Sequence, residues 1–150
     1  MTRINMRVSD ELRTAMCARG ETLSDGVRDS LERYYYLLER SRTQMAELFD
    51  RDELVALCAV GNGTLFEAHT IEGLLWNMED AIAGEEIELS EDQKAALLDK
   101  LRGLTLTQHA ALVDAVERFW RAKRLGVCVD PGTILRELDA VERQRAGGEA

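Results

Sequence analysis

The sequence predicts a mainly α protein, in which one N-terminal strand and two helices precede an all-α domain of about four to five helices. Residues 2–8 alternate between polar and apolar side chains, which is the period of a strand. The remaining chain has apolar residues at i, i+3, i+4 spacing and a single proline, Pro131. A hydrophobic content of 45% over 150 residues is enough for a folded core.

The predicted strand has one apolar and one polar face. The apolar face carries Ile4, Met6 and Val8. The polar face carries Arg3, Asn5 and Arg7. A single strand can neither pair its backbone nor bury its apolar face. The simplest partner is the same strand of a second copy, which would give a two-stranded antiparallel ribbon.

Two amphipathic helices are expected after the strand. The first begins at the capping residue Ser9 and ends at Gly20. The second begins at Ser24 and extends through Met45, up to Phe49. Their apolar faces carry Leu12, Ala15 and Met16, and Val27, Leu31, Tyr34, Tyr35 and Leu38.

This order of elements over about residues 2–45 resembles the ribbon-helix-helix family of DNA-binding proteins (Arc/MetJ/CopG-like). The stretch TLSDGVRDSL at residues 22–31 follows Gly20 and matches the family's hydroxyl, acidic, basic and apolar positions. Gly26 departs from the pattern, because the family usually has a larger apolar residue there. A glycine inside a helix costs about 1 kcal/mol relative to alanine.

The resemblance implies an intertwined homodimer that inserts its ribbon into the DNA major groove. Arg3, Asn5 and Arg7 would then read bases, since Arg suits guanine and Asn suits adenine. The free amides at the start of the second helix would hold a phosphate. The candidate phosphate residues are Thr22, Ser24, Asp25 and Arg28; an ion pair between Arg28 and Glu32 is a slightly favoured alternative for Arg28. The implied dimer core consists of Ile4, Met6, Val8, Leu12, Met16, Val27, Leu31, Tyr34, Tyr35 and Leu38.

The remaining chain is predicted to be a separate helical domain. We expect residues 1–46 to form the DNA-binding and dimerisation domain, 47–145 an acidic helical domain and 146–150 a disordered tail. Ser90 and Gln93 match a capping box, and Thr105 or Thr107 can cap the next helix. Residues 1–42 carry a net charge of +1 (8 Arg against 7 Asp and Glu), and residues 43–150 carry −10 (11 against 21). DNA contacts are therefore expected only at the N-terminus.

Other classes of function have little support in the sequence. The three cysteines fit neither a disulfide framework nor a zinc motif, which favours a reduced cytoplasm. There is no signal-peptide core and no apolar run of membrane-spanning length. A metal site could be assembled only from scattered residues such as His69 with Glu72, or Cys58 with Cys128, and none is predicted. No catalytic motif is present, so we expect neither an enzyme nor a cofactor.

The expected function is that of a cytoplasmic, bacterial-type transcriptional regulator that acts as a repressor. It would bind double-stranded DNA as a homodimer, and a dimer of dimers is a further possible state. Its C-terminal helices would serve oligomerisation, an effector or a protein partner. The alternative is an antitoxin or protein-binding adaptor that dimerises through the N-terminal part and captures a protein through those helices. A plasmid-transfer DNA binder would share the same fold.

Overall fold

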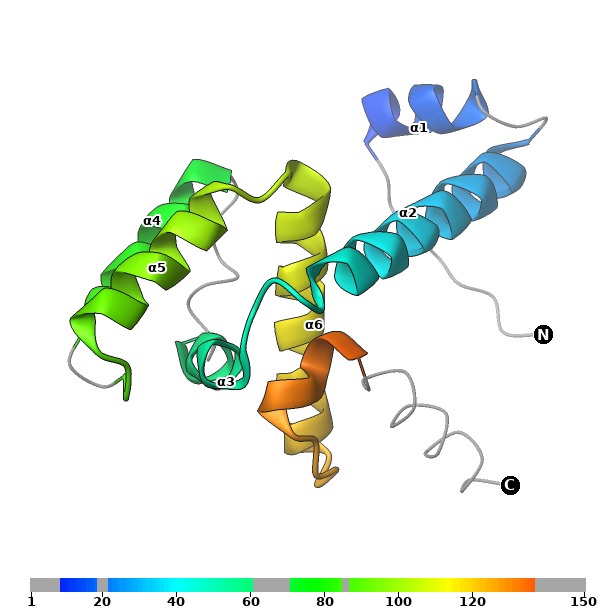
Figure 1. The fold of residues 1–150 in the computed structure, drawn as a ribbon. Helices are drawn as coiled ribbons and strands as arrows, with labels where there is room; N and C mark the ends of the chain where they lie inside the picture. Colours follow the sequence, from blue (N-terminus) through cyan, green and yellow to red (C-terminus); the bar gives the residue numbers. More distant parts are fainter. Residues whose placement is uncertain (1–8, 19–21, 61–70, 85–86, 137–150) are drawn as a thin grey trace. The chain divides into compact units, whose positions relative to one another are not determined.

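The computed structural model describes residues 9–18, 22–60, 71–84 and 87–136, and the chain divides into two compact units, Met1–Leu37 and Leu38–Ala150. Every regular element in these residues is helical (Figure 1). The elements are α1 (Asp10–Cys17), α2 (Leu23–Met45), α3 (Arg51–Val60), α4 (Ile71–Ala83), α5 (Glu91–Arg102), α6 (Leu106–Arg124) and the 3-10 helix η2 (Pro131–Thr133).

The mainly α prediction is confirmed, but the predicted N-terminal ribbon is not: no strand occurs in the described parts of the chain. Residues 2–8, which were expected to form it, lie outside the described residues. Alternation of polar and apolar side chains is a weak signal for a strand when the chain offers no second strand to pair with it. The fold class is therefore corrected to an all-helical one for the part of the chain that the structure describes.

The first unit contains α1 and the part of α2 up to Leu37. Ser9 caps α1 as predicted, with its Oγ accepting a hydrogen bond from the Leu12 amide at 3.3 Å. α2 is continuous from Leu23 to Met45, and the division between the units falls inside it. The predicted domain boundary after residue 46 lies later than this, at the end of the same helix.

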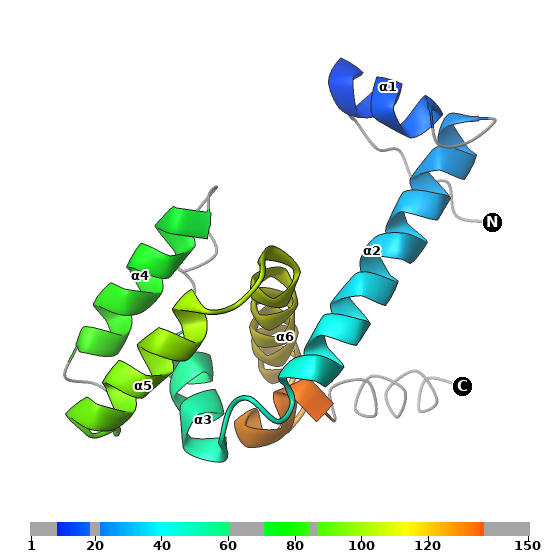
Figure 2. The same cartoon turned by 45° about the horizontal axis from the view of Figure 1, so that its top comes forward.

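The second unit has one apolar core, to which the end of α2 from Leu38 on, the helices α3 to α6, and Ile134 and Leu135 contribute. α4 and α5 lie side by side, and α3 contacts α4, α6 and η2 (Figures 1 and 2). The largest core side chains that are essentially inaccessible to solvent are Met45, Leu57, Cys58, Ile82, Leu97, Leu101, Leu112 and Ile134.

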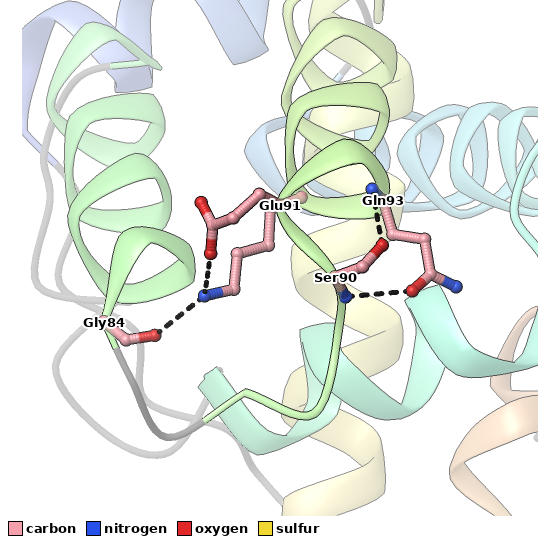
Figure 3. Close-up of polar contacts among 5 residues, drawn as sticks. Gly84, Ser90, Glu91 and Gln93 are labelled. Carbon is pink, nitrogen blue, oxygen red and sulfur yellow. Dashed lines mark hydrogen bonds and ion pairs between the residues drawn. The ribbon is translucent and has the colours of Figure 1, made fainter.

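Capping boxes define the starts of the helices in this unit. The Ser90 Oγ accepts a hydrogen bond from the Gln93 amide at 3.3 Å, and the Ser90 amide donates to Gln93 Oε1 at 2.9 Å, which confirms the predicted box (Figure 3). Thr105 and Gln108 make the same exchange at the start of α6. These reciprocal bonds satisfy amides that a helix end leaves unpaired.

Charged pairs connect segments of the second unit that are far apart in sequence. The Lys100 Nζ lies 2.7 Å from both carboxylate oxygens of the buried Glu53, which joins α5 to the start of α3. The Arg51 guanidinium donates to Asp130 Oδ2 at 2.6 Å and lies directly against Gly132. η2 is thereby fixed beside α3.

Candidate functional site

The predicted base-reading residues Arg3, Asn5 and Arg7 lie outside the described residues, as do Ile4, Met6 and Val8 of the predicted dimer core. Their roles remain predictions. The site can be built from α1 and α2, which follow this segment and carry the remaining residues that the sequence singled out.

Gly26 lies at a close contact between α1 and α2. It is buried, and a Cβ atom placed there would lie 1.9 Å from the main-chain oxygen of Met16. Real carbon and oxygen atoms do not come so close, so only glycine allows the α1 main chain to rest on α2 at this point. The departure of Gly26 from the family pattern therefore has a packing reason that the sequence did not reveal.

The N-terminus of α2 is capped by its own side chains. The Thr22 Oγ1 accepts a hydrogen bond from the Asp25 amide at 3.2 Å and donates to Asp25 Oδ2 at 2.6 Å. The Arg28 Nη1 lies 3.6 Å from Asp25 Oδ1, so Arg28 forms its ion pair with Asp25 rather than with the predicted Glu32. Ser24 is exposed.

This arrangement limits what the α2 N-terminus can bind. The Asp25 amide is already engaged, and its carboxylate offsets the partial positive charge, roughly half an elementary charge, of a helix N-terminus. A phosphate there would depend on the Arg28 side chain, which is 68% exposed and free to turn from Asp25 towards an anion. Of the four predicted phosphate residues, Thr22 caps α2 and is bonded to Asp25, and Arg28 is the one that carries a positive charge.

The apolar face of α2 differs between its two halves. Leu31 is 60% exposed and Tyr34 is 55% exposed, whereas Leu38 and Met45, further along the same face, are buried in the core of the second unit. We call Val27, Leu31 and Tyr34 the Leu31 stripe. Tyr35 and Leu12 of α1 are also exposed, and Met16 and Val27 are half-buried. Leu38 therefore belongs to the core of its own chain and is not available to a partner, contrary to the prediction for it.

The described residues contain no group of three or more His, Cys, Asp or Glu side chains that could hold a metal ion. His109 is buried, and burial lowers its pKa. Cys58 is also buried, which raises the pKa of its thiol to about 12, while Cys17 and Cys128 are exposed. His69 lies outside the described residues.

Sequence reasoning missed two features of α2. Tyr36 and Leu37 are exposed on faces of the helix other than the Leu31 stripe, and Tyr36, at 63%, is more exposed than its neighbours. The only available signal was the run of three consecutive tyrosines at 34–36, of which Tyr34 and Tyr35 were assigned to the dimer core.

None of the described helices is long and apolar enough to cross a membrane.

Comparisons with known proteins add no relative: no protein-family model matches the chain, and no curated protein or solved structure resembles it significantly.

Proposed function

We propose that this chain is a self-associating DNA-binding transcription regulator, a repressor, in which the first unit pairs with a second copy and contacts DNA. The exposed Leu31 stripe carries the proposal. Apolar side chains at i, i+4, i+7 form one continuous face of a helix, and a contiguous exposed apolar face is typical of an interaction surface.

A second copy is the partner that this stripe fits best. In the C-terminal half of α2 the same face is buried by the chain itself, so the exposed half is a continuation of a packed surface. Fully burying one leucine contributes about 1.5–3 kcal/mol, and a two-fold contact buries Leu31 and Tyr34 twice. Covering the stripe on both copies therefore favours association of two α2 helices.

DNA is the proposed ligand because of the charge and chemistry of the N-terminal residues. The first 42 residues have a net charge of +1 and the rest −10, so only the N-terminal part suits a polyanion. Arg3, Asn5 and Arg7 carry the side chains that recognise guanine and adenine edges. Arg28, which is exposed near the start of α2, would add a contact to a phosphate.

The test is selection of bound DNA from a random pool at a fixed salt concentration. A two-fold protein should enrich a palindromic or repeated site. Each lost arginine contact should cost about 1–3 kcal/mol, so an Arg3→Ala/Arg7→Ala variant should bind the enriched site at least about tenfold more weakly. Arg121→Ala/Arg124→Ala, on the exposed end of α6, is the matched control and should bind like the parent.

Unchanged binding by the Arg3→Ala/Arg7→Ala variant would refute the assignment of these residues. Selection without enrichment, together with a co-purifying protein, would refute DNA binding and favour the adaptor alternative. Leu31→Asp tests association separately, since it should reduce the mass of the particle in solution.

A further inference from the structure

Three consecutive tyrosines on α2 cannot all face the same partner. Residues in an α-helix are separated by about 100°, so Tyr36 points about 200° away from Tyr34. Tyr34 and Tyr35 are each 55% exposed and Tyr36 is 63% exposed. A partner helix that covers the Leu31 stripe therefore leaves Tyr36 on the far side of α2.

Tyr36 lies between two opposite charges on that far side. Glu32 and Arg40 are four residues before and four residues after it, which places all three side chains on one face of the helix. Both charged residues are exposed, and neither forms an ion pair with another described residue. We call Glu32, Tyr36 and Arg40 the Tyr36 face.

We propose that the Tyr36 face is a second docking surface, on which α2 of another copy of this chain lies antiparallel across a two-fold axis at Tyr36. Such an axis places Glu32 of each copy opposite Arg40 of the other, because both are four residues from the centre. The two tyrosine rings meet between these pairs. The face is therefore complementary to itself in charge, as an isologous contact requires.

The neighbouring charges agree with this pairing. Arg33 and Glu39 are three residues before and three after Tyr36, so the same axis also places them opposite each other. Within the chain, Arg33 is paired with Asp29 at 3.0 Å and Glu39 with Arg42 at 2.9 Å. Glu32 and Arg40 are thus the two charges that this contact would satisfy for the first time.

The consequence goes beyond a dimer. Because the Leu31 stripe and the Tyr36 face lie on opposite sides of α2, a chain that uses both assembles into particles larger than two copies. The Tyr36 face is small compared with a stable interface of about 1,200–2,000 Å², so this second step should depend on protein concentration. Two weakly associated dimers could then occupy neighbouring DNA sites.

The test is to measure, by sedimentation over a range of protein concentrations, the mass of the particles that the full-length chain forms. The parent should form particles heavier than twice the 16.9 kDa chain at high concentration. Glu32→Arg and Arg40→Glu each place like charges opposite each other and should weaken this step at least about tenfold. The double variant restores opposite charges and should restore the assembly. Glu117→Arg and Arg121→Glu, an exposed pair on α6, are the matched controls.

The proposal is overturned if the single reversals leave the mass unchanged, or if the double variant assembles no better than the singles. A dimer that survives Leu31→Asp but dissociates with Glu32→Arg would support the Tyr36 face and contradict the Leu31 stripe. A parent that stays dimeric at every concentration, and dissociates only with Leu31→Asp, would retain the stripe and reject the Tyr36 face. None of these measurements requires DNA, so they are independent of the proposed DNA binding.

Discussion

Replacing Gly26 with alanine tests the contact between α1 and α2, because the two expected effects have opposite signs. In an isolated helix, alanine is more favourable than glycine by about 1 kcal/mol. In the folded chain, the new Cβ would lie 1.9 Å from the Met16 oxygen and 2.7 Å from its carbonyl carbon. Packed atoms prefer separations of about 3.5 Å, so α1 would have to move by roughly 1.5 Å.

The size of the effect follows from these two terms. Forcing an extra carbon into a packed contact costs about 1–3 kcal/mol, and the overlapping atoms belong to the main chain, which cannot rotate away. After subtracting the gain in helix propensity, Gly26→Ala should destabilise the first unit by up to about 2 kcal/mol. Gly26→Val should be worse, because its larger, β-branched side chain enters the same space.

Hydrogen exchange of the full-length chain is the appropriate assay, since it reports on α1 directly. The amides of α1 (Asp10–Cys17) should exchange faster in Gly26→Ala, while those of α5 and α6 should not change. Ser24→Ala, at an exposed position of the same helix, is the control for a general effect of alanine. An increase in stability with unchanged exchange in α1 would show that α1 does not rest on Gly26.

Three further predictions concern the second unit. Lys100→Met should cost up to about 3 kcal/mol in urea unfolding, because the buried Glu53 carboxylate loses its cation and keeps only the hydrogen bond from the Asp50 amide. Glu53→Gln in the same chain should recover part of this cost, and equal stability of the single and double variants would contradict the prediction. Asp130→Asn should destabilise the protein at neutral pH. The hydrogen bond and charge of Arg51 lower the pKa of Asp130 from its ordinary value of 3.8, so the stability that the ion pair contributes should be lost below pH 3.8, as the carboxylate is protonated. A stability difference between parent and variant that is independent of pH would refute the pair. A thiol reagent at pH 8 should label two of the three cysteines in the native chain and all three in denaturant, because burial raises the pKa of Cys58 to about 12; rapid native labelling of Cys58 would contradict its burial.

The features that the sequence predicted well are local ones. The capping box at Ser90 depends on side chains three residues apart, so its pattern can be read directly from the sequence. Thr105 and Thr107 were both candidate caps for the next helix, and the structure has Thr105 in a capping box with Gln108. Helix positions follow from the spacing of apolar residues for the same reason. The strand prediction failed because alternation over seven residues says nothing about a partner, and a strand exists only with one.

The features that the sequence did not predict depend on contacts between residues that are far apart in the sequence. Gly26 was unexplained because the neighbour that requires glycine lies on another helix. Arg51 and Asp130 are 79 residues apart, and Glu53 and Lys100 are 47 apart, so no local pattern connects them. Arg28 was assigned the wrong carboxylate because residues three and four positions away are equally close on a helix surface.

The hardest distinction for sequence reasoning was between the two halves of α2. Leu31 and Leu38 are one heptad apart on the same face, and nothing in the pattern shows that one is exposed and the other buried. What separates them is the return of the chain about 90 residues later: Arg136 donates to the main-chain oxygen of Ala46 at 2.8 Å, and the adjacent Ile134 and Leu135 join the core that buries Leu38. The C-terminal half of α2 is thus covered from within the chain, and an apolar face that its own chain leaves open is where a second copy can bind.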